Sequence, residues 1–297
     1  MFLCSMITDD IDIDGVGTAI LCVLLALMVI AAVAVNVVPR IVHKWEIEYK
    51  TRDLTVGATC LAIAFALSWA TLFRMPNGGR VTPGALAPLF IYCYYFGFRK
   101  GMIVSTAYTL LQFLQGATVV SPWSAFFDYI LPYFAVCLVG LFAYKPDKYA
   151  AFVKKNKEKR GLGAVKTWAF TISGHYGIFV GAVVHMLIRY LSQCVSSMLF
   201  WAYGAPPAEA FTVGLAYNSF GLVDSAIAVV ALVLLLSSRT FNAYMSQTTG
   251  GKKTFVAEPT ADGTTESPSL EAAAAADDTI ATDDNAVATS ENEINKN

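Results

Sequence analysis

Charged side chains are scarce in this chain. Asp, Glu, Lys and Arg make up 14% of its 297 residues, whereas a soluble domain carries about a quarter. Hydrophobic residues make up 56% and gather in long runs separated by short polar turns. This pattern excludes an ordinary soluble globular protein and predicts an all-α membrane protein with several membrane-spanning helices. Nothing in the sequence indicates nucleic-acid binding.

Residues for metal, disulfide and nucleotide chemistry are also missing. The six cysteines stand singly without a C-x-x-C pair, and three histidines are too few for a metal cluster. The string GGKKT from Gly250 lacks the upstream glycine and the Ser or Thr of a phosphate-binding loop, so the chain should not hydrolyse ATP itself. No nucleophile–base pair stands at a suitable spacing. We therefore predict no metal site, no cofactor and no enzyme activity.

The first apolar run has an acidic segment before it and a basic segment after it. Val16–Val38 is long enough to span a bilayer, and its acidic start, residues 1–15, differs from that of a cleaved signal peptide. Residues 39–53 carry four basic side chains, Arg40, Lys44, Lys50 and Arg52. The positive-inside rule therefore places this loop in the cytoplasm and the N-terminus outside.

Six further spans are predicted between residues 54 and 240. They are Leu54–Phe73, Pro83–Phe98, Gly101–Gly116, Trp123–Tyr144, one span within Ala164–Tyr203, and Thr212–Leu236. The fold expected is thus a six-helix core with one extra N-terminal transmembrane helix, and the basic loops and the C-terminus fall inside. Residues 241–297 are rich in Thr, Ser, Ala, Asp and Glu, which predicts a disordered acidic cytoplasmic tail.

A carboxylate inside the span Trp123–Tyr144 is the main candidate for a binding site. A charge at the centre of a membrane helix costs about 2.5–3.5 kcal/mol on insertion scales, so Asp128 indicates function unless it reaches water or a basic partner. A carboxylate among rings and amides would suit a small, flat, positively charged ligand. For the aromatic residues, the alternative is an interfacial belt. By this topology the following side chains lie at the same outer depth as Asp128: Tyr129, Gln193, Trp201, Asn218, Trp69 and Asn77.

His185 and Arg189 share a helix face with Gln193, because the three are four residues apart. They are candidates for ligand contacts, a proton relay or an internal ion pair. An ion pair between Arg189 and Asp128 would neutralise both groups and leave no carboxylate for a cation.

Small residues recur every four positions in the span Leu54–Phe73. Ala58, Ala62 and Ala66 belong to this strip, which lets another helix approach closely. The partner of the strip is either another span of the same chain or a separate subunit.

Several ordered segments together resemble one transporter family. They are MPNGGRVTPGALAPLFIYCYYFGFRKG, LLQFLQG, FFDYILPYFAVCLVGLF, RYLSQCVSSMLFWAYGAP and LAYNSFGL. From roughly Leu54 to Leu236 the chain resembles the thiamine-specific S component of energy-coupling factor (ECF) vitamin transporters. The resemblance implies a cell-membrane protein that captures thiamine from outside. It also implies a transmembrane coupling subunit, docked on Ala58, Ala62 and Ala66, and two cytoplasmic ATPase subunits as partners.

The resemblance also assigns ligand contacts. The family's acidic–Tyr pair falls on Asp128 and Tyr129, with Asp where the family usually has Glu. Its Trp and Asn fall on Trp201 and Asn218.

Two positions depart from the family pattern. Gln193 stands where the family has a ligand-binding His, and Val213 where it has a Tyr, with Phe211 and Tyr217 as substitutes outside the register. These departures leave open whether the ligand is thiamine, a precursor or its pyrimidine half. The alternative function is a proton-coupled secondary carrier for a small cationic or pyrimidine-like metabolite, with Asp128 or His185 as the proton site.

Overall fold

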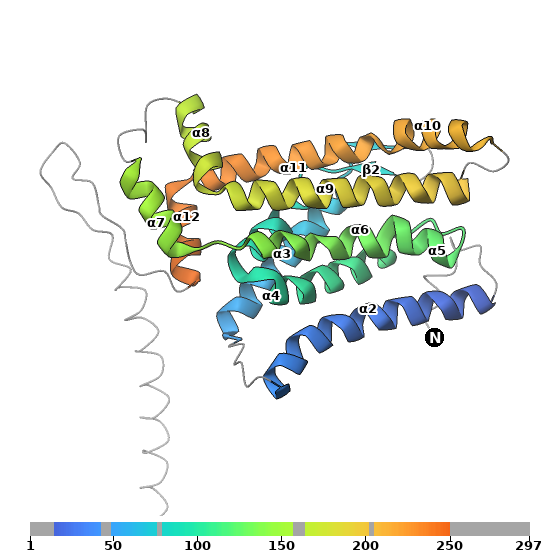
Figure 1. Ribbon diagram of the computed structural model, residues 1–297, viewed down its shortest axis with the longest axis horizontal. Coiled ribbons are helices and arrows are strands. Elements are labelled where there is room, and N and C mark those ends of the chain that lie inside the picture. Colours follow the sequence, from blue (N-terminus) through green and yellow to red (C-terminus); the bar gives the residue numbers. More distant parts are fainter. Residues whose placement is uncertain (1–14, 43–48, 76–78, 157–163, 202–204, 250–297) are drawn as a thin grey trace, which may run out of the picture. The chain divides into compact units, whose positions relative to one another are not determined.

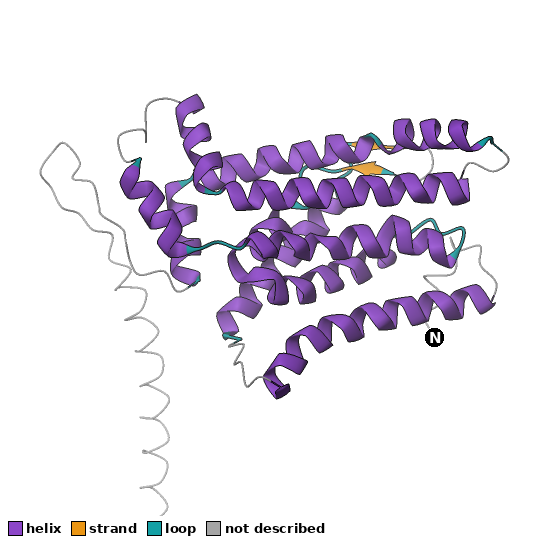
Figure 2. Cartoon of the chain, viewed as in Figure 1, coloured by secondary structure: helices purple, strands orange, loops and turns teal. Residues whose placement is uncertain are grey.

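The computed structural model describes residues 15–42, 49–75, 79–156, 164–201 and 205–249. Nearly all of these residues are helical (Figure 2), apart from an antiparallel pair of two-residue strands, β1 (Phe73–Arg74) and β2 (Arg80–Val81). The helices up to residue 142 are α2 (Gly15–Val42), α3 (Thr51–Trp69), α4 (Ala87–Leu114), α5 (Pro122–Ala125), η1 (Phe126–Ile130), α6 (Leu131–Phe134) and η2 (Ala135–Phe142). Those that follow are α7 (Pro146–Lys155), α8 (Ala164–Gly174), α9 (Tyr176–Ser196), η4 (Ser197–Trp201), α10 (Pro207–Asn218), α11 (Phe220–Ser237) and α12 (Arg239–Thr248).

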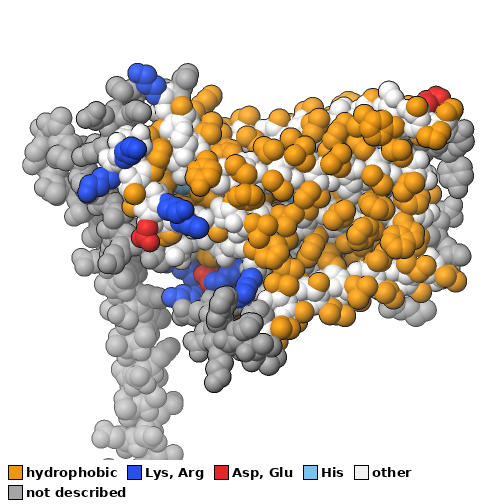
Figure 3. All heavy atoms as spheres, viewed as in Figure 1, with side chains coloured by type: hydrophobic (Ala, Val, Ile, Leu, Met, Phe, Trp, Pro, Cys, Tyr) orange, Lys and Arg blue, Asp and Glu red, His pale blue; other side chains and the backbone are white. Residues whose placement is uncertain are grey.

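The helices are apolar enough for a bilayer, which confirms the predicted fold class. Four stretches within the described residues are long and apolar enough to cross a membrane: Gly15–Val38, Pro122–Phe142, Tyr176–Trp201 and Pro207–Ser237. Apolar side chains cover the face of these helices seen in Figure 3, and Lys and Arg gather at the end where α7 and α12 lie. The chain is an all-α membrane protein. The total of seven spans stays a prediction.

The two predicted spans Pro83–Phe98 and Gly101–Gly116 correspond to the two arms of α4. Gly97 interrupts this helix with φ 82° and ψ 172°, a conformation that residues with a side chain rarely adopt. Beyond the break, a Cβ on Gly101 would lie 2.8 Å from the Cys93 sulfur. Eight residues of straight helix cover about 12 Å, so the chain turns sharply at Gly97.

The buried core lies where α4 meets η2, α9 and α11. Leu89, Phe90 and Val136 have almost no exposed surface there. Gly140 of η2 allows the close approach, because a Cβ at this position would lie 2.4 Å from the backbone nitrogen of Phe98. The α4 turn is thereby pressed directly against η2.

The predicted tail boundary is wrong by about eight residues. Residues 241–248 were expected to be disordered, but α12 extends over Arg239–Thr248. The Ser238 hydroxyl caps the helix by accepting from the Phe241 N–H (3.3 Å), and Met245 is buried in the main core. This helix depends on a tertiary contact, which a search for apolar periodicity does not detect.

Other predicted segments are only partly described. The acidic N-terminus up to residue 14, residues 43–48 of the basic loop, and the tail from residue 250 lie outside the described residues. The basic loop after Tyr144 contains a helix, α7, over Pro146–Lys155.

Candidate binding site

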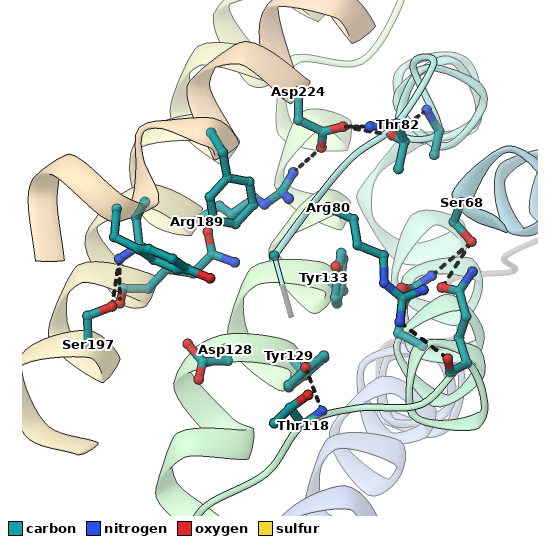
Figure 4. Close-up of a pocket in the computed structure, with 18 of the residues that line it drawn as sticks. Ser68, Arg80, Thr82, Thr118, Asp128, Tyr129, Tyr133, Arg189, Ser197 and Asp224 are labelled. Atoms are coloured by element: carbon teal, nitrogen blue, oxygen red, sulfur yellow. Dashed lines mark hydrogen bonds and ion pairs between the residues drawn. The ribbon is translucent and has the colours of Figure 1, made fainter. Parts of the chain in front are cut away.

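A cavity of about 160 Å³ lies among the core helices. One enclosed water needs about 10–15 Å³, so the cavity has room for a small organic molecule. Its walls come from α3, β2, α4, η1, α6, α9, η4, α10 and α11, and Figure 4 shows the side chains arranged around a central space. The lining is mixed, with polar groups among aromatic rings, as in ligand sites generally.

Asp128 lies on one wall of the cavity. Its Oδ2 accepts a hydrogen bond from the Ser196 hydroxyl (2.7 Å) and a longer one from the Trp201 indole N–H (3.4 Å). Among the described residues, no Lys or Arg pairs with this carboxylate. Neutral donors therefore orient the Asp128 carboxylate, and no cation among the described residues forms an ion pair with it.

Both Asp128 and Trp201 lie in π-helical turns, η1 and η4. In η1 the Leu131 N–H reaches back five residues to the Phe126 carbonyl. Pro132, next in the chain, has no N–H to offer the Phe127 carbonyl. The Ser192 hydroxyl of α9 donates to that carbonyl instead (2.6 Å). Such turns are uncommon and often lie at functional sites.

The second carboxylate of the cavity, Asp224, is fully paired. Its Oδ2 accepts from Arg189 Nη1 at 2.6 Å, and its Oδ1 accepts from the backbone N–H and the hydroxyl of Thr82 at 2.8 and 2.7 Å (Figure 4). Arg189 also lies over the Tyr133 ring, 5.9 Å from its centroid. A buried charge needs this kind of pairing. Arg189 thus pairs with Asp224 rather than with Asp128.

Two polar atoms beside this ion pair have no hydrogen-bond partner among the described residues. They are Arg189 Nε, a donor, and Gln193 Oε1, an acceptor, on side chains that are 4% and 8% exposed. A Cβ on Gly221 would lie 3.4 Å from Gln193 Oε1 and 4.0 Å from Arg189 Nε. The donor and the acceptor therefore flank the same glycine of α11. An unpaired buried polar atom costs about 1–3 kcal/mol, and neither of these two atoms has surface open to the cavity.

Aromatic rings form much of the remaining wall. The Tyr133 ring meets Tyr108 edge-on at 5.5 Å, and Tyr129 lies 6.4 Å away. The Tyr129 hydroxyl accepts from the Thr118 N–H (3.0 Å), so its ring is fixed at the cavity edge. These rings offer faces to a flat or cationic ligand.

Comparison with known proteins gives the family. The family model described as Thiamine transporter protein (Thia_YuaJ) matches residues 54–244, which is more than half of the chain. The chain belongs to this family. It is thus a thiamine uptake transporter of the membrane. The search of curated proteins gave no match.

The structure brings the main predicted contacts of the transporter together. The cavity is lined by Asp128, Tyr129, Gln193, Trp201 and Asn218, and by two of the weaker candidates, Arg189 and Tyr217. The Asn218 amide also donates to Ser197 Oγ (2.7 Å) and to the Gly214 carbonyl (2.8 Å). It therefore also ties α10 to η4. Val213 lines the cavity too, whereas Phe211, a suggested substitute for a missing Tyr, does not.

Two candidates lie away from the cavity and one is not described. Trp69 is 59% exposed and stacks edge-on with Phe65, so its predicted place in the site is wrong. His185 is fully buried behind the wall, where Nε2 lies 3.0 Å from the Pro132 carbonyl oxygen. Asn77 lies outside the described residues.

Several residues that line the cavity of the transporter were not among the predicted contacts. Asp224 is the clearest case, because the same rule that selected Asp128, a carboxylate within an apolar span, applies to Thr212–Leu236. Other missed residues are polar or aromatic side chains with no local signal: Ser68, Arg80, Thr82, Tyr108, Gln112, Gln115, Tyr133 and Ser197.

Proposed function

We propose that this thiamine transporter is the substrate-binding S component of an ECF-type importer and that the cavity holds thiamine itself. The observation that carries the proposal is the unpaired carboxylate of Asp128, next to the rings of Tyr129 and Trp201. Since Arg189 cancels the charge of Asp224, Asp128 is the group available to a positively charged thiazolium ring. The guanidinium of Arg80 donates to the Gln115 and Gly116 carbonyls, and Figure 4 places it on a different side of the cavity from Asp128.

The pyrimidine half of thiamine suits the other polar pair. An aminopyrimidine presents a ring nitrogen acceptor beside an amino donor. Arg189 and Gln193 line the cavity and carry the opposite pattern, a donor at Nε and an acceptor at Oε1 that lack partners among the described residues. Both atoms are buried, so the two side chains would have to turn to reach the ligand. Gln193 thus replaces the hydrogen-bonding function of the family's His, though not its ring.

ATP-driven uptake would require partner subunits. Ala58, Ala62 and Ala66 are exposed along one face of α3, which supports their use as a docking strip for a transmembrane coupling subunit. In this arrangement two cytoplasmic ATPase subunits supply the energy, and the chain catalyses no reaction. The N-terminus lies outside the cell membrane and the C-terminus in the cytoplasm.

A proton-coupled carrier is the competing mechanism. It has less support, because of its two proposed proton sites, Asp128 and His185, the second is enclosed behind the cavity wall. Uptake by cells with and without the coupling subunit separates the two mechanisms. A carrier transports in both strains, and an S component only in the first.

The binding proposal is tested by calorimetry of the detergent-purified chain with thiamine, its pyrimidine half and its thiazole half. We expect thiamine to bind more tightly than either half, because it engages both the carboxylate and the polar pair. Absence of thiamine binding, or equal affinity for the pyrimidine half alone, would contradict the proposal.

A further inference from the structure

Helix α2 lies outside the residues that match the family, yet it packs against the binding site. The match begins at residue 54, and α2 ends at Val42. The helix contacts α4, α5 and η1 (Figure 1). The last of these is the π-helical turn that carries Asp128 and Tyr129. The position of α2 therefore raises the question of what it contributes to that turn.

One stripe of α2 makes the contact. Leu21 and Met28 are buried in a cluster with Phe113, Val119 and Ile130. Tyr129, which lines the cavity, packs against the same cluster. The apolar layer behind the Tyr129 ring is thus partly built by α2.

The opposite face of α2 is exposed rather than buried. Val23, Leu27 and Ile30 are all more than half exposed, as expected for side chains that face lipid. A helix that served only as a membrane anchor would not need one stripe to be buried against the rest of the chain. The contrast between the two faces also supplies matched controls.

The inner part of α2 is anchored as well. Asn36 is buried, and its amide donates to the Arg99 carbonyl at 3.1 Å, just beyond the α4 turn at Gly97. The Tyr49 hydroxyl donates to Asn36 Oδ1. A buried amide in a membrane helix is costly unless it is satisfied. These bonds hold α2 in one position along the core, so the Leu21–Met28 stripe stays opposite η1.

We propose that α2 positions the π-helical turn η1, and thereby Tyr129 and Asp128, for ligand binding. A π-turn is held by its surroundings rather than by its own preference. Ser192 supports η1 from α9 through the Phe127 carbonyl, and the stripe of α2 supports it from the other side. This inference rests on the proposed binding of thiamine in the cavity.

The test uses Leu21→Ala and Met28→Ala in the full chain, with Leu27→Ala and Ile30→Ala as controls of the same kind on the exposed face. We expect the Kd for thiamine to rise about tenfold in the first pair and to stay unchanged in the second. A tenfold effect is typical of coupling between residues that share one packed cluster, as the α2 stripe and Tyr129 do. Met28→Leu, which keeps the volume, should restore wild-type affinity. All variants are compared below their unfolding temperature, so that loss of folded protein does not contribute to the Kd.

A second measurement needs no ligand. Hydrogen exchange of the ligand-free chain reports local opening of residues 126–134. We expect faster exchange there in Met28→Ala than in Leu27→Ala. Unchanged Kd and unchanged exchange in a less stable Met28→Ala protein would overturn the inference and leave α2 as a stabilising helix. If the wild-type chain fails to bind thiamine, the proposed function fails, and the exchange result alone decides the role of α2.

Discussion

The two carboxylates in the cavity show how one residue type takes two roles. Asp224 accepts from Arg189 and Thr82 and is an internal structural charge. Among the residues that the structure describes, Asp128 accepts from two neutral side chains, Ser196 and Trp201. The difference lies in the neighbours that the fold supplies, not in the residue. It makes opposite predictions for the two Asp→Asn variants.

For Asp128→Asn, we predict a loss of thiamine affinity with little loss of stability. The amide keeps the size of the side chain and an oxygen for Ser196, but it removes the charge that attracts a cation. Bonds to charged groups contribute about 1.5–3 kcal/mol, so the Kd should rise at least tenfold by calorimetry. Glu209→Gln, an exposed carboxylate on α10, is the control and should bind as the wild type. Equal affinities in both variants would rule out the assigned role of Asp128.

For Asp224→Asn, we predict a loss of stability. The change leaves the Arg189 guanidinium buried without its ion-pair partner, which typically costs about 3–5 kcal/mol. Thermal unfolding of the ligand-free chain should show a clear fall in Tm. The double variant Arg189→Met with Asp224→Leu removes both charges and should recover most of the Tm. A double variant as unstable as Asp224→Asn would show that the pair is not the cause.

At the scale of elements, the support of η1 by a neighbouring helix is directly testable. Ser192→Ala removes the hydroxyl that donates to the Phe127 carbonyl. Pro132 cannot supply a replacement donor, because it has no N–H. We predict destabilisation by about 1–3 kcal/mol, the cost of an unsatisfied buried group, measured as a fall in Tm. Thr212→Ala is the control, because its hydroxyl is exposed and donates to the Ala208 carbonyl of its own helix. Similar Tm shifts in the two variants would contradict the special role of Ser192.

Elements with an apolar pattern were predictable from the sequence, and elements held by tertiary contacts were not. The first span was expected at Val16–Val38, and the structure gives a membrane-length stretch at Gly15–Val38. The π-turn η1 has no such signal, because it depends on Pro132 together with the Ser192 hydroxyl 60 residues later in the chain. For the same reason α12 was missed, since it is fixed by Met245 in the core.

The candidate site was predictable to a similar degree. Asp128 was found because a charge in an apolar run is visible in the sequence. Trp201 and Asn218 were candidates from their depth along their spans, and the family resemblance selected the same positions. Tyr108 and Tyr133 carry no local signal, since a tyrosine in an apolar run is as often a packing residue. Trp69 was wrongly included because depth along a span does not specify which way a side chain points. That direction depends on helix rotation, which packing decides.

At the scale of the whole molecule, a cluster of rings joins helices at the end opposite the cavity. His175, between α8 and α9, lies 4.4 Å from the Tyr149 ring of α7 and 6.0 Å from Tyr94 of α4, measured between ring centroids. Tyr144 stacks on His175, and the Tyr95 ring also lies beside His175. The Tyr95 hydroxyl donates to Asn242 of α12 (3.1 Å). The basic end of the protein is thus tied to the membrane core through one buried imidazole.

This imidazole should make stability depend on pH. Burial lowers the pKa of His175 from 6.5 to about 4, because loss of solvent disfavours the charged imidazolium. Between these values the unfolded chain binds a proton that the folded chain does not. The contribution is therefore fully present above pH 6.5 and is lost as the pH falls toward 4. At pH 5 the free energy of unfolding should be about 2 kcal/mol lower than at pH 7.5 from this residue alone.

Comparison with His175→Phe isolates this effect from the titration of other groups. The phenyl ring keeps the contacts with Tyr149 and Tyr144 but cannot take up a proton. We predict that the fall in Tm of the detergent-purified protein between pH 7.5 and pH 5 is smaller in His175→Phe than in the wild type. His185→Phe is unsuitable as a control, because the change would remove the hydrogen bond between the His185 ring and the Pro132 carbonyl near the cavity. Parallel pH profiles for the wild type and His175→Phe would mean that the folded protein accepts the proton, and hence that the cluster opens to water without unfolding.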